Sequence, residues 1–105
     1  MVSRFRVAEA DAGEFRERAR AALAALAERP GYVGGHVGRN VDDAELWLLT
    51  TTWRNTGSYR RALSAYDVKL TAVPLLSQAI DEPSAYEDLT TEEASQNQSV
   101  PRHLD

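Results

Sequence analysis

The chain has 105 residues, a length that suits one domain with one hydrophobic core. It carries 12 Lys and Arg residues against 16 Asp and Glu residues, so its net charge is −4, and neither nucleic acid nor an anionic membrane is an expected partner. The absence of cysteine excludes disulfides, thiolate metal sites and cysteine nucleophiles. No stretch has the composition of a secretory signal or a transmembrane helix, so we expect a cytoplasmic protein.

The first third of the chain predicts a strand followed by a helix. Residues 2–8, VSRFRVA, alternate between apolar and polar side chains, as a half-buried strand does. Residues 11–29 then carry apolar side chains at helical spacing, with Asp11 placed to cap the helix. Pro30 and Gly31 end the helix.

The middle of the chain predicts a β-hairpin. Its strands are residues 32–39, YVGGHVGR, and residues 46–53, LWLLTTTW, joined by a polar turn. In the second strand Leu46 and Leu48 point one way, while Trp47, Leu49 and Trp53 point the other. Both faces of this strand are therefore expected to avoid water.

The last third predicts a second helix and a final strand. Residues 55–70 follow the helical period, with Asn55 at the capping position and with Tyr59 and Tyr66 on one face. Pro74 kinks or restarts the helix, and residues 83–89 form a short last strand. Residues 90–105 read as a polar tail behind a domain that spans residues 1–89.

The order β-α-β-β-α-β predicts a ferredoxin-like α+β subunit, an antiparallel sheet with its helices on one face. The other face is then bare, and we expect it to display Trp47, Leu49 and Trp53. Such a patch exceeds what a soluble monomer usually exposes, so we predict a homodimer formed through the sheet face.

Two polar side chains of the predicted strands are candidates for chemistry. His36 could act as a base, because its unperturbed pKa of about 6.5 suits proton removal, although a histidine at a strand edge or dimer interface fits the pattern too. Arg6 could hold an anionic substrate or simply be solvated. The glycines at 34, 35 and 38 match no phosphate-binding motif, and no metal-binding spacing exists.

Residues 28–63, ERPGYVGGHVGRNVDDAELWLLTTTWRNTGSYRRAL, together with PLLSQAIDEPSAYE at 74–87, resemble the antibiotic biosynthesis monooxygenase family. The shared signals are the RPGYVGG entry to the second strand, a third strand that ends in Trp, and a helix that opens with NTGSY. The resemblance covers roughly residues 2–89 and implies a dimeric α+β barrel. It also implies an oxygenase that needs no metal, flavin or other cofactor: an aromatic phenol is deprotonated, and its anion reacts with O₂ to give a quinone.

The resemblance extends to individual positions. Trp53 matches the family's strand tryptophan, and Tyr59 matches a helix tyrosine that some members place at the substrate, although both could equally be core packing. Leu49 stands where quinone-forming members carry Asn, and residues 71–73 stand where they carry Arg. The predicted catalytic residues are His36, Tyr59 and Trp53, and the predicted substrate-binding residues are Tyr32, Leu49, Arg6 and Tyr66.

The leading interpretation is a cofactor-independent monooxygenase that uses O₂ on a small aromatic or polycyclic, polyketide-like substrate. The alternative is a non-catalytic protein that binds an aromatic metabolite on the same scaffold. Haem binding or degradation ranks third, because the family's haem-degrading branch uses a His on the second helix and an Asn on the first strand. This chain has neither residue in those places.

Overall fold

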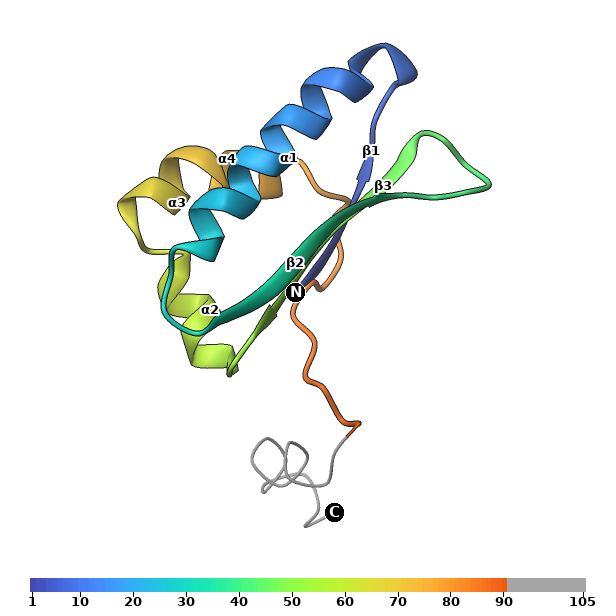
Figure 1. The fold of residues 1–105 in the computed structure, drawn as a ribbon. Coiled ribbons are helices and arrows are strands. Elements are labelled where there is room, and N and C mark those ends of the chain that lie inside the picture. The colour runs from blue at the N-terminus through green and yellow to red at the C-terminus, as the bar shows by residue number, and fades with distance from the viewer. Residues whose placement is uncertain (91–105) are drawn as a thin grey trace.

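The computed structural model describes residues 1–90, so the predicted tail lies outside the described residues except for Thr90. Within these residues, three strands and four α-helices follow one another (Figure 1). In order they are β1 (Val2–Arg6), the short 3₁₀ helix η1 (Glu9–Asp11), α1 (Ala12–Ala27), β2 (Tyr32–Arg39), β3 (Leu46–Trp53), α2 (Thr56–Ala62), α3 (Tyr66–Thr71) and α4 (Val73–Leu76).

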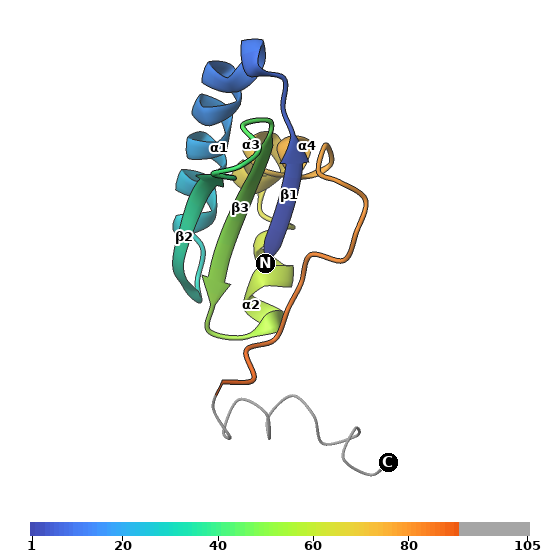
Figure 2. The same ribbon diagram turned by 90° about the vertical axis from the view of Figure 1, so that its right-hand side faces the viewer.

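The strands form one antiparallel sheet in the order β1-β3-β2. The helices gather on one face of this sheet (Figure 1), and Figure 2 looks onto the face that they leave uncovered. The predicted α+β architecture, an antiparallel sheet with helices on a single face, is therefore confirmed. Within residues 1–90 no helix combines the length and the apolar character needed to cross a membrane.

Aromatic side chains from three elements make the centre of the core. The ring centroid of Phe15 on α1 lies 5.0 Å from that of Phe5 and 5.3 Å from that of Trp47. Trp47 is only 3% exposed and Leu49 beside it is fully buried. Small helix residues complete the layer, since Ala19 is also fully buried and lets α1 approach the sheet closely.

The prediction that Trp47, Leu49 and Trp53 lie on the uncovered face is wrong. Trp53 packs against the core beside Tyr59 on the helix side, and Trp47 and Leu49 are buried in this core. Their register partners in β1 are the buried residues Phe5 and Ser3, which places both side chains on the helix side of the sheet. The uncovered face instead carries Leu46, Leu48, Thr50 and Thr52, and Leu48 is 36% exposed. Alternation showed that both faces of β3 are apolar, but it could not tell which face the helices would choose.

The predicted last strand at residues 83–89 is also wrong for this subunit. The chain after α4 runs beside β1 and makes two backbone hydrogen bonds with it, from Ile80 N to Arg4 O (2.8 Å) and from Val2 N to Ser84 O (2.7 Å). The guanidinium of Arg4 additionally forms a bidentate ion pair with the Glu82 carboxylate, with both hydrogen bonds at 2.8 Å. Beyond Ser84 the chain leaves the sheet in extended form and forms no ladder (Figure 2).

The helix predicted over residues 55–70 is two helices. Ala65 is extended, with ψ of 142°, and separates α2 from α3. As a result Tyr66 is 75% exposed at the start of α3 and does not share a face with Tyr59. Pro74 lies in the first turn of α4, as the predicted restart requires.

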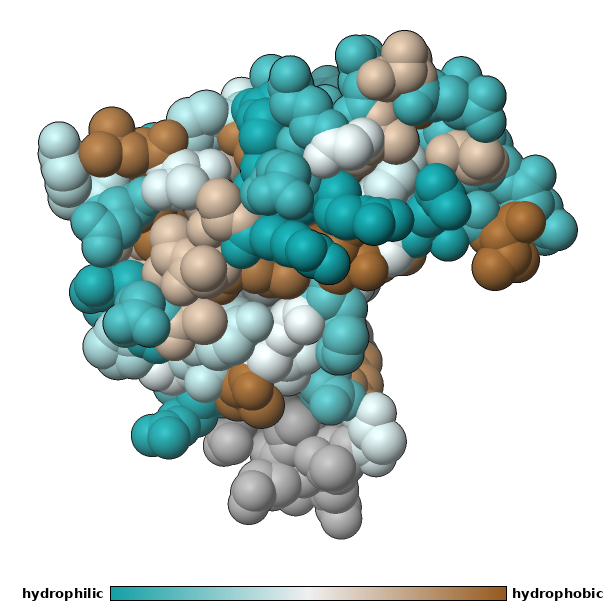
Figure 3. All heavy atoms as spheres, turned by 45° about the horizontal axis from the view of Figure 1, so that its top comes forward, coloured by the Kyte–Doolittle hydropathy of each residue, from teal (hydrophilic) through white to brown (hydrophobic). Residues whose placement is uncertain are grey.

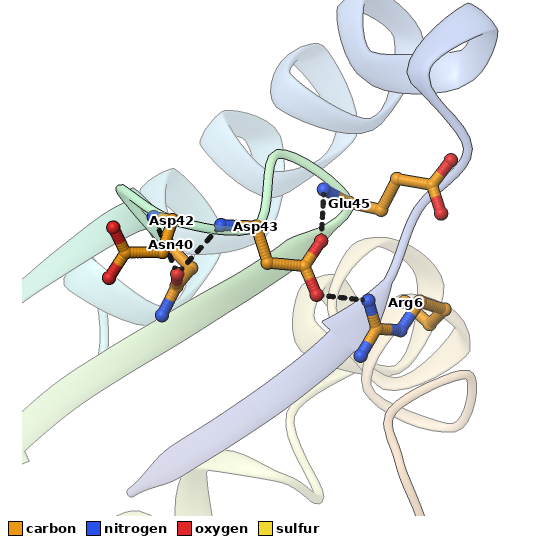
Figure 4. Close-up of polar contacts among 5 residues, drawn as sticks. All are labelled: Arg6, Asn40, Asp42, Asp43 and Glu45. Carbon is orange, nitrogen blue, oxygen red and sulfur yellow. Dashed lines mark hydrogen bonds and ion pairs between the residues drawn. The ribbon is translucent and has the colours of Figure 1, made fainter.

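The β2–β3 turn is held by its own polar side chains (Figure 4). Asn40 Oδ1 accepts hydrogen bonds from the backbone N–H groups of Asp42 and Asp43, at 2.8 and 2.9 Å. Asp43 in turn accepts from Glu45 N at 3.0 Å and from the Arg6 guanidinium at 2.6 Å. The hydrogen bond from Arg6 holds the pKa of the Asp43 carboxyl below its ordinary value. Both aspartates thus belong to the polar turn that the sequence predicts between the two strands.

Two glycines in β2 predict opposite responses to the same substitution. A Cβ on Gly35 would lie 2.6 Å from the Tyr32 hydroxyl and 2.8 Å from both Leu23 Cδ2 and the Thr50 carbonyl oxygen, whereas a Cβ on Gly34 meets nothing within 4 Å. We expect Gly35→Ala to lower the free energy of unfolding by about 1–3 kcal/mol, because the Thr50 backbone cannot give way. Gly34→Ala, the matched control, should cost no comparable stability in urea unfolding followed by circular dichroism. Equal losses in both variants would contradict this account of the close packing at Gly35.

Candidate functional site

A cavity of about 330 Å³ opens where β3 runs into α2. Its walls come from the start of β1, the end of β3, the beginning of α2 and the extended segment after α4. The lining residues are 1–2, 50–56, Tyr59 and 85–88. Segments that are far apart in sequence therefore meet here, as sites for small molecules generally require.

The junction between β3 and α2 is fixed by a cap and a tight turn. Asn55 caps α2 as predicted, because its Oδ1 accepts a hydrogen bond of 2.8 Å from Ser58 N. The carbonyl of Gly31 accepts a 2.7 Å hydrogen bond from Arg54 N. Gly31 has a φ of 91°, and a Cβ there would collide with the Ser58 side chain, so only glycine suits this contact. The cavity wall is thus built on restrained backbone.

Trp53 is held in place by a hydrogen bond and two aromatic contacts. Its indole Nε1 donates to Thr51 Oγ1 at 2.7 Å. Its ring lies edge-on to Tyr32, at 5.3 Å and 85°, and tilted toward Tyr59, at 5.7 Å and 48°. Because the indole N–H is already used, Trp53 offers a ligand its ring and not a hydrogen-bond donor.

Tyr59 provides a phenol group that stays protonated at neutral pH. Burial raises the pKa of its hydroxyl above the ordinary value of 10.0, and a hydrogen bond with the Ser84 side chain acts weakly in the other direction. Tyr59 also lines a second cavity of about 290 Å³ toward Ser3 and Ile80. Its hydroxyl is therefore a donor between two hollows and not a base.

His36 does not share this cavity. It is exposed on β2 directly opposite Thr50, whose neighbour Thr51 is buried on the helix side, so His36 belongs to the uncovered face of the sheet. Tyr59 packs against the core on the helix side. Within one subunit the structure does not bring the predicted base to the predicted phenol, and the role of His36 stays a prediction.

The four predicted substrate-binding residues are dispersed. Tyr32 contacts the cavity only through Trp53, and Leu49 is fully buried in the core. The guanidinium of Arg6 is paired with Asp43 in the β2–β3 turn, and Tyr66 lies on α3 with most of its surface in solvent. None of the four is among the residues that line the cavity.

Sequence reasoning missed the polar part of the cavity wall. Arg54 follows β3 immediately and adds a cation to the lining, and Tyr86, which is 68% exposed, lines the cavity from the extended segment. The two β3-end neighbours Thr50 and Thr52 add hydroxyls. The position of Arg54 directly after the strand tryptophan was the available signal. Residues 85–88 carried none, because their place depends on where the chain crosses β1.

The described part of the chain offers no evident metal site. No three His, Asp or Glu side chains among residues 1–90 gather closely enough to hold an ion. The chemistry that this cavity can supply is therefore an aromatic wall, hydroxyl groups, a protonated phenol and a guanidinium. Such a wall fits an aromatic molecule that carries a phenolic or anionic oxygen.

The fold defines a small ferredoxin-like α+β domain, and this domain has an aromatic cavity at the end of β3. The family model for antibiotic biosynthesis monooxygenase matches residues 1–71, and the chain belongs to that family. No curated protein matches the sequence.

Solved structures share this fold over most of their length. SnoaB from Streptomyces nogalater, described as a cofactor-independent oxygenase, is 27% identical with a TM-score of 0.65. That match covers 86% of this chain and 94% of SnoaB. A conserved protein from Methanosarcina mazei Go1 is 19% identical with a TM-score of 0.65, covering 80% of this chain and 82% of its own, and this likeness concerns the fold alone.

The buried phenol of Tyr59 predicts a dependence of stability on alkaline pH. With a raised pKa in the folded state, the folded chain keeps a proton that the unfolded chain releases near pH 10, so this contribution to stability is present below about pH 10 and is lost as pH rises through the raised value. Urea unfolding between about pH 8 and 11 should show a shallower decline for Tyr59→Phe than for the unaltered protein. Tyr66→Phe is the control and should keep the original slope, and a Tyr59→Phe slope equal to it would refute the burial argument.

Proposed function

We propose that this protein is a cofactor-independent monooxygenase that acts with O₂ on a small aromatic or polycyclic phenol. The observation that carries the proposal is the cavity walled by Trp53 and Tyr59 in a chain of the antibiotic biosynthesis monooxygenase family. The similarity to SnoaB, itself described as a cofactor-independent oxygenase, supports the same reaction class. The cavity, at about 330 Å³, lies at the small end of ligand pockets and favours a compact substrate.

The proposed reaction needs the substrate as its anion. A phenol that loses its proton to solvent or a base becomes electron-rich, and transfer of electrons to O₂ follows. The carbon para to the hydroxyl loses its C–H bond and gains one oxygen atom, while the second oxygen atom leaves as water. The products are a quinone and one water, and the substrate itself supplies the four electrons that reduce O₂.

The cavity residues would act by stabilising that anion. The hydroxyl of Tyr59 can donate to a phenolate oxygen, and the guanidinium of Arg54 makes the rim favourable for negative charge. Trp53 would hold the flat ring by stacking, since its N–H is engaged by Thr51. His36 has no part in this scheme, because it lies on the other side of the sheet.

The activity test is oxygen consumption with a panel of hydroxynaphthalenes and hydroxyanthrones in chelator-treated buffer. We expect O₂ uptake with quinone formation, and a loss of roughly 10- to 100-fold in rate for Tyr59→Phe, because one donor to the anion is removed. Tyr66→Phe makes the same chemical change on an exposed helix and should keep full activity. Product formation that continues under argon would exclude the oxygenase. A ligand that binds and is recovered unchanged in air would favour the binding-protein alternative.

We further propose that two copies pack through the uncovered sheet face. That face carries Leu48 at its centre, with Val2 and Leu46 half-buried beside it, and no helix of residues 1–90 covers it (Figure 2). The extended segment after Ser84 also leaves Tyr86 and Leu89 largely exposed, which a second copy could cover. The resemblance to a family of dimeric barrels supports this arrangement.

The dimer proposal predicts a position-dependent effect of a new charge. Leu48→Glu should shift the mass measured by light scattering at micromolar concentration toward that of a single chain, because a charge buried between two sheets is costly. Val41→Glu is the matched control, since Val41 is 96% exposed at the β2–β3 turn, and it should leave the mass at twice that of one chain. A single-chain mass for the unaltered protein would overturn the proposal.

A further inference from the structure

A second hollow, of about 490 Å³, lies between α1 and the edge strand β2. It shares no lining residue with the cavity of Trp53 and Tyr59. We call it the arginine groove, and the side chains that define it are Arg16, Arg20, Leu23, Arg39 and Trp47. Helix α1 runs beside β2 in Figure 1, which is how these residues come together.

The groove concentrates positive charge in a chain whose net charge is negative. Three arginines line it, and none of its lining residues is acidic. His36 is also among the lining residues, but its side chain belongs to the other face of the sheet. The ion pairs found among residues 1–90 involve Arg4 and Arg6, so the three groove arginines have no carboxylate partner in the described part of the chain. Arg16 and Arg20 lie one helical turn apart, a spacing at which like charges repel. An anion in the groove would relieve this repulsion.

The surface around the groove is hydrophilic, but its floor is not. Figure 3 shows a broad band of hydrophilic residues over α1, with hydrophobic residues only in separate patches. Inside the groove Leu23 and Val37 present apolar side chains, and the guanidinium carbon of Arg39 lies 5.3 Å from the centroid of the Trp47 ring. This is cation–π geometry, and it joins a charged rim to an aromatic floor.

The indole N–H of Trp47 independently indicates that a hydrogen-bond acceptor is missing at the groove. Its side chain is more than nine-tenths buried, and its indole Nε1 has no hydrogen-bond partner among residues 1–90. Buried donors are nearly always satisfied, and an orphaned one at a hollow calls for an acceptor from outside the chain. An anion oxygen that enters the groove is such an acceptor, once the ring moves slightly toward it.

We propose that the arginine groove binds a small organic anion with a flat apolar body, an aromatic carboxylate. Guanidinium groups recognise carboxylates through paired hydrogen bonds, and the apolar floor takes the ring. A long polyanion suits the site less well, because the rest of this acidic chain repels it and the groove, at about 490 Å³, has small-molecule size. The site is separate from the proposed oxygenase cavity and does not depend on it.

The test uses the two indole N–H signals as reporters in a ¹⁵N-labelled full chain. Trp53→Phe removes one signal and so assigns the other to Trp47. Titration with benzoate should shift the Trp47 signal saturably and leave the Trp53 signal in place. Benzamide, which has the same shape without the charge, and inorganic phosphate, which lacks the ring, should each bind at least tenfold more weakly.

Variants locate the binding residues. Replacing both Arg16 and Arg20 with Gln should weaken benzoate binding at least tenfold. If that double variant does not fold, Arg39→Gln alone provides the test and should weaken binding severalfold. Arg60→Gln removes the same charge from an exposed position on α2, outside the groove, and should leave the affinity within twofold.

Four results would overturn the proposal: no shift of the Trp47 signal, equal binding of benzamide, equal binding of phosphate, or a shift confined to Trp53. A Trp47 signal that moves with protein concentration alone would instead make the groove a contact between copies. In contrast, an absence of O₂ uptake together with intact benzoate binding would contradict the proposed oxygenase function and leave the arginine-groove proposal standing.

Discussion

The burial of one face of β3 beneath the helices organises the whole subunit. Trp47 and Leu49 join Phe5 and Phe15 in a single layer, and their removal from water is the dominant favourable term available to a chain of this size. Because side chains alternate along a strand, this choice sends Leu48 and its neighbouring threonines to the uncovered face.

The candidate site lies at the end of the same strand. Trp53 follows the buried positions of β3 and still points toward the helix side, but there its neighbours are Tyr32 and Tyr59 and a hollow opens beside them. The same face of β3 thus packs in the core along most of the strand and lines the cavity at its end. The cap at Asn55 and the glycine turn at Gly31 keep this end rigid, which suits a wall that must hold a flat ring.

Charge is distributed as unevenly as hydrophobicity. Arg4 and Arg6, on the uncovered face, are each matched with a carboxylate, Glu82 or Asp43, whereas the arginines between α1 and β2 are not. The net charge of −4 hides this difference, since a sum over the chain carries no position. A protein that is acidic overall can therefore carry a local group of unpaired arginines, and the fold gathers them by laying one helix along an edge strand.

The sequence by itself determined the strand–helix order through Trp53, the caps and turns at Asn55 and Pro30–Gly31, and the family, because these depend on periodicity and on local backbone chemistry. The tertiary structure alone decided which face of β3 is buried, that residues 83–89 form no strand here, and that Tyr66 turns away from Tyr59. It also separated His36 and Arg6 from the aromatic cavity and placed Arg54 on its rim. These outcomes depend on long-range packing: when two faces of a strand are both apolar, only the helices that arrive from elsewhere in the chain determine which one leaves water.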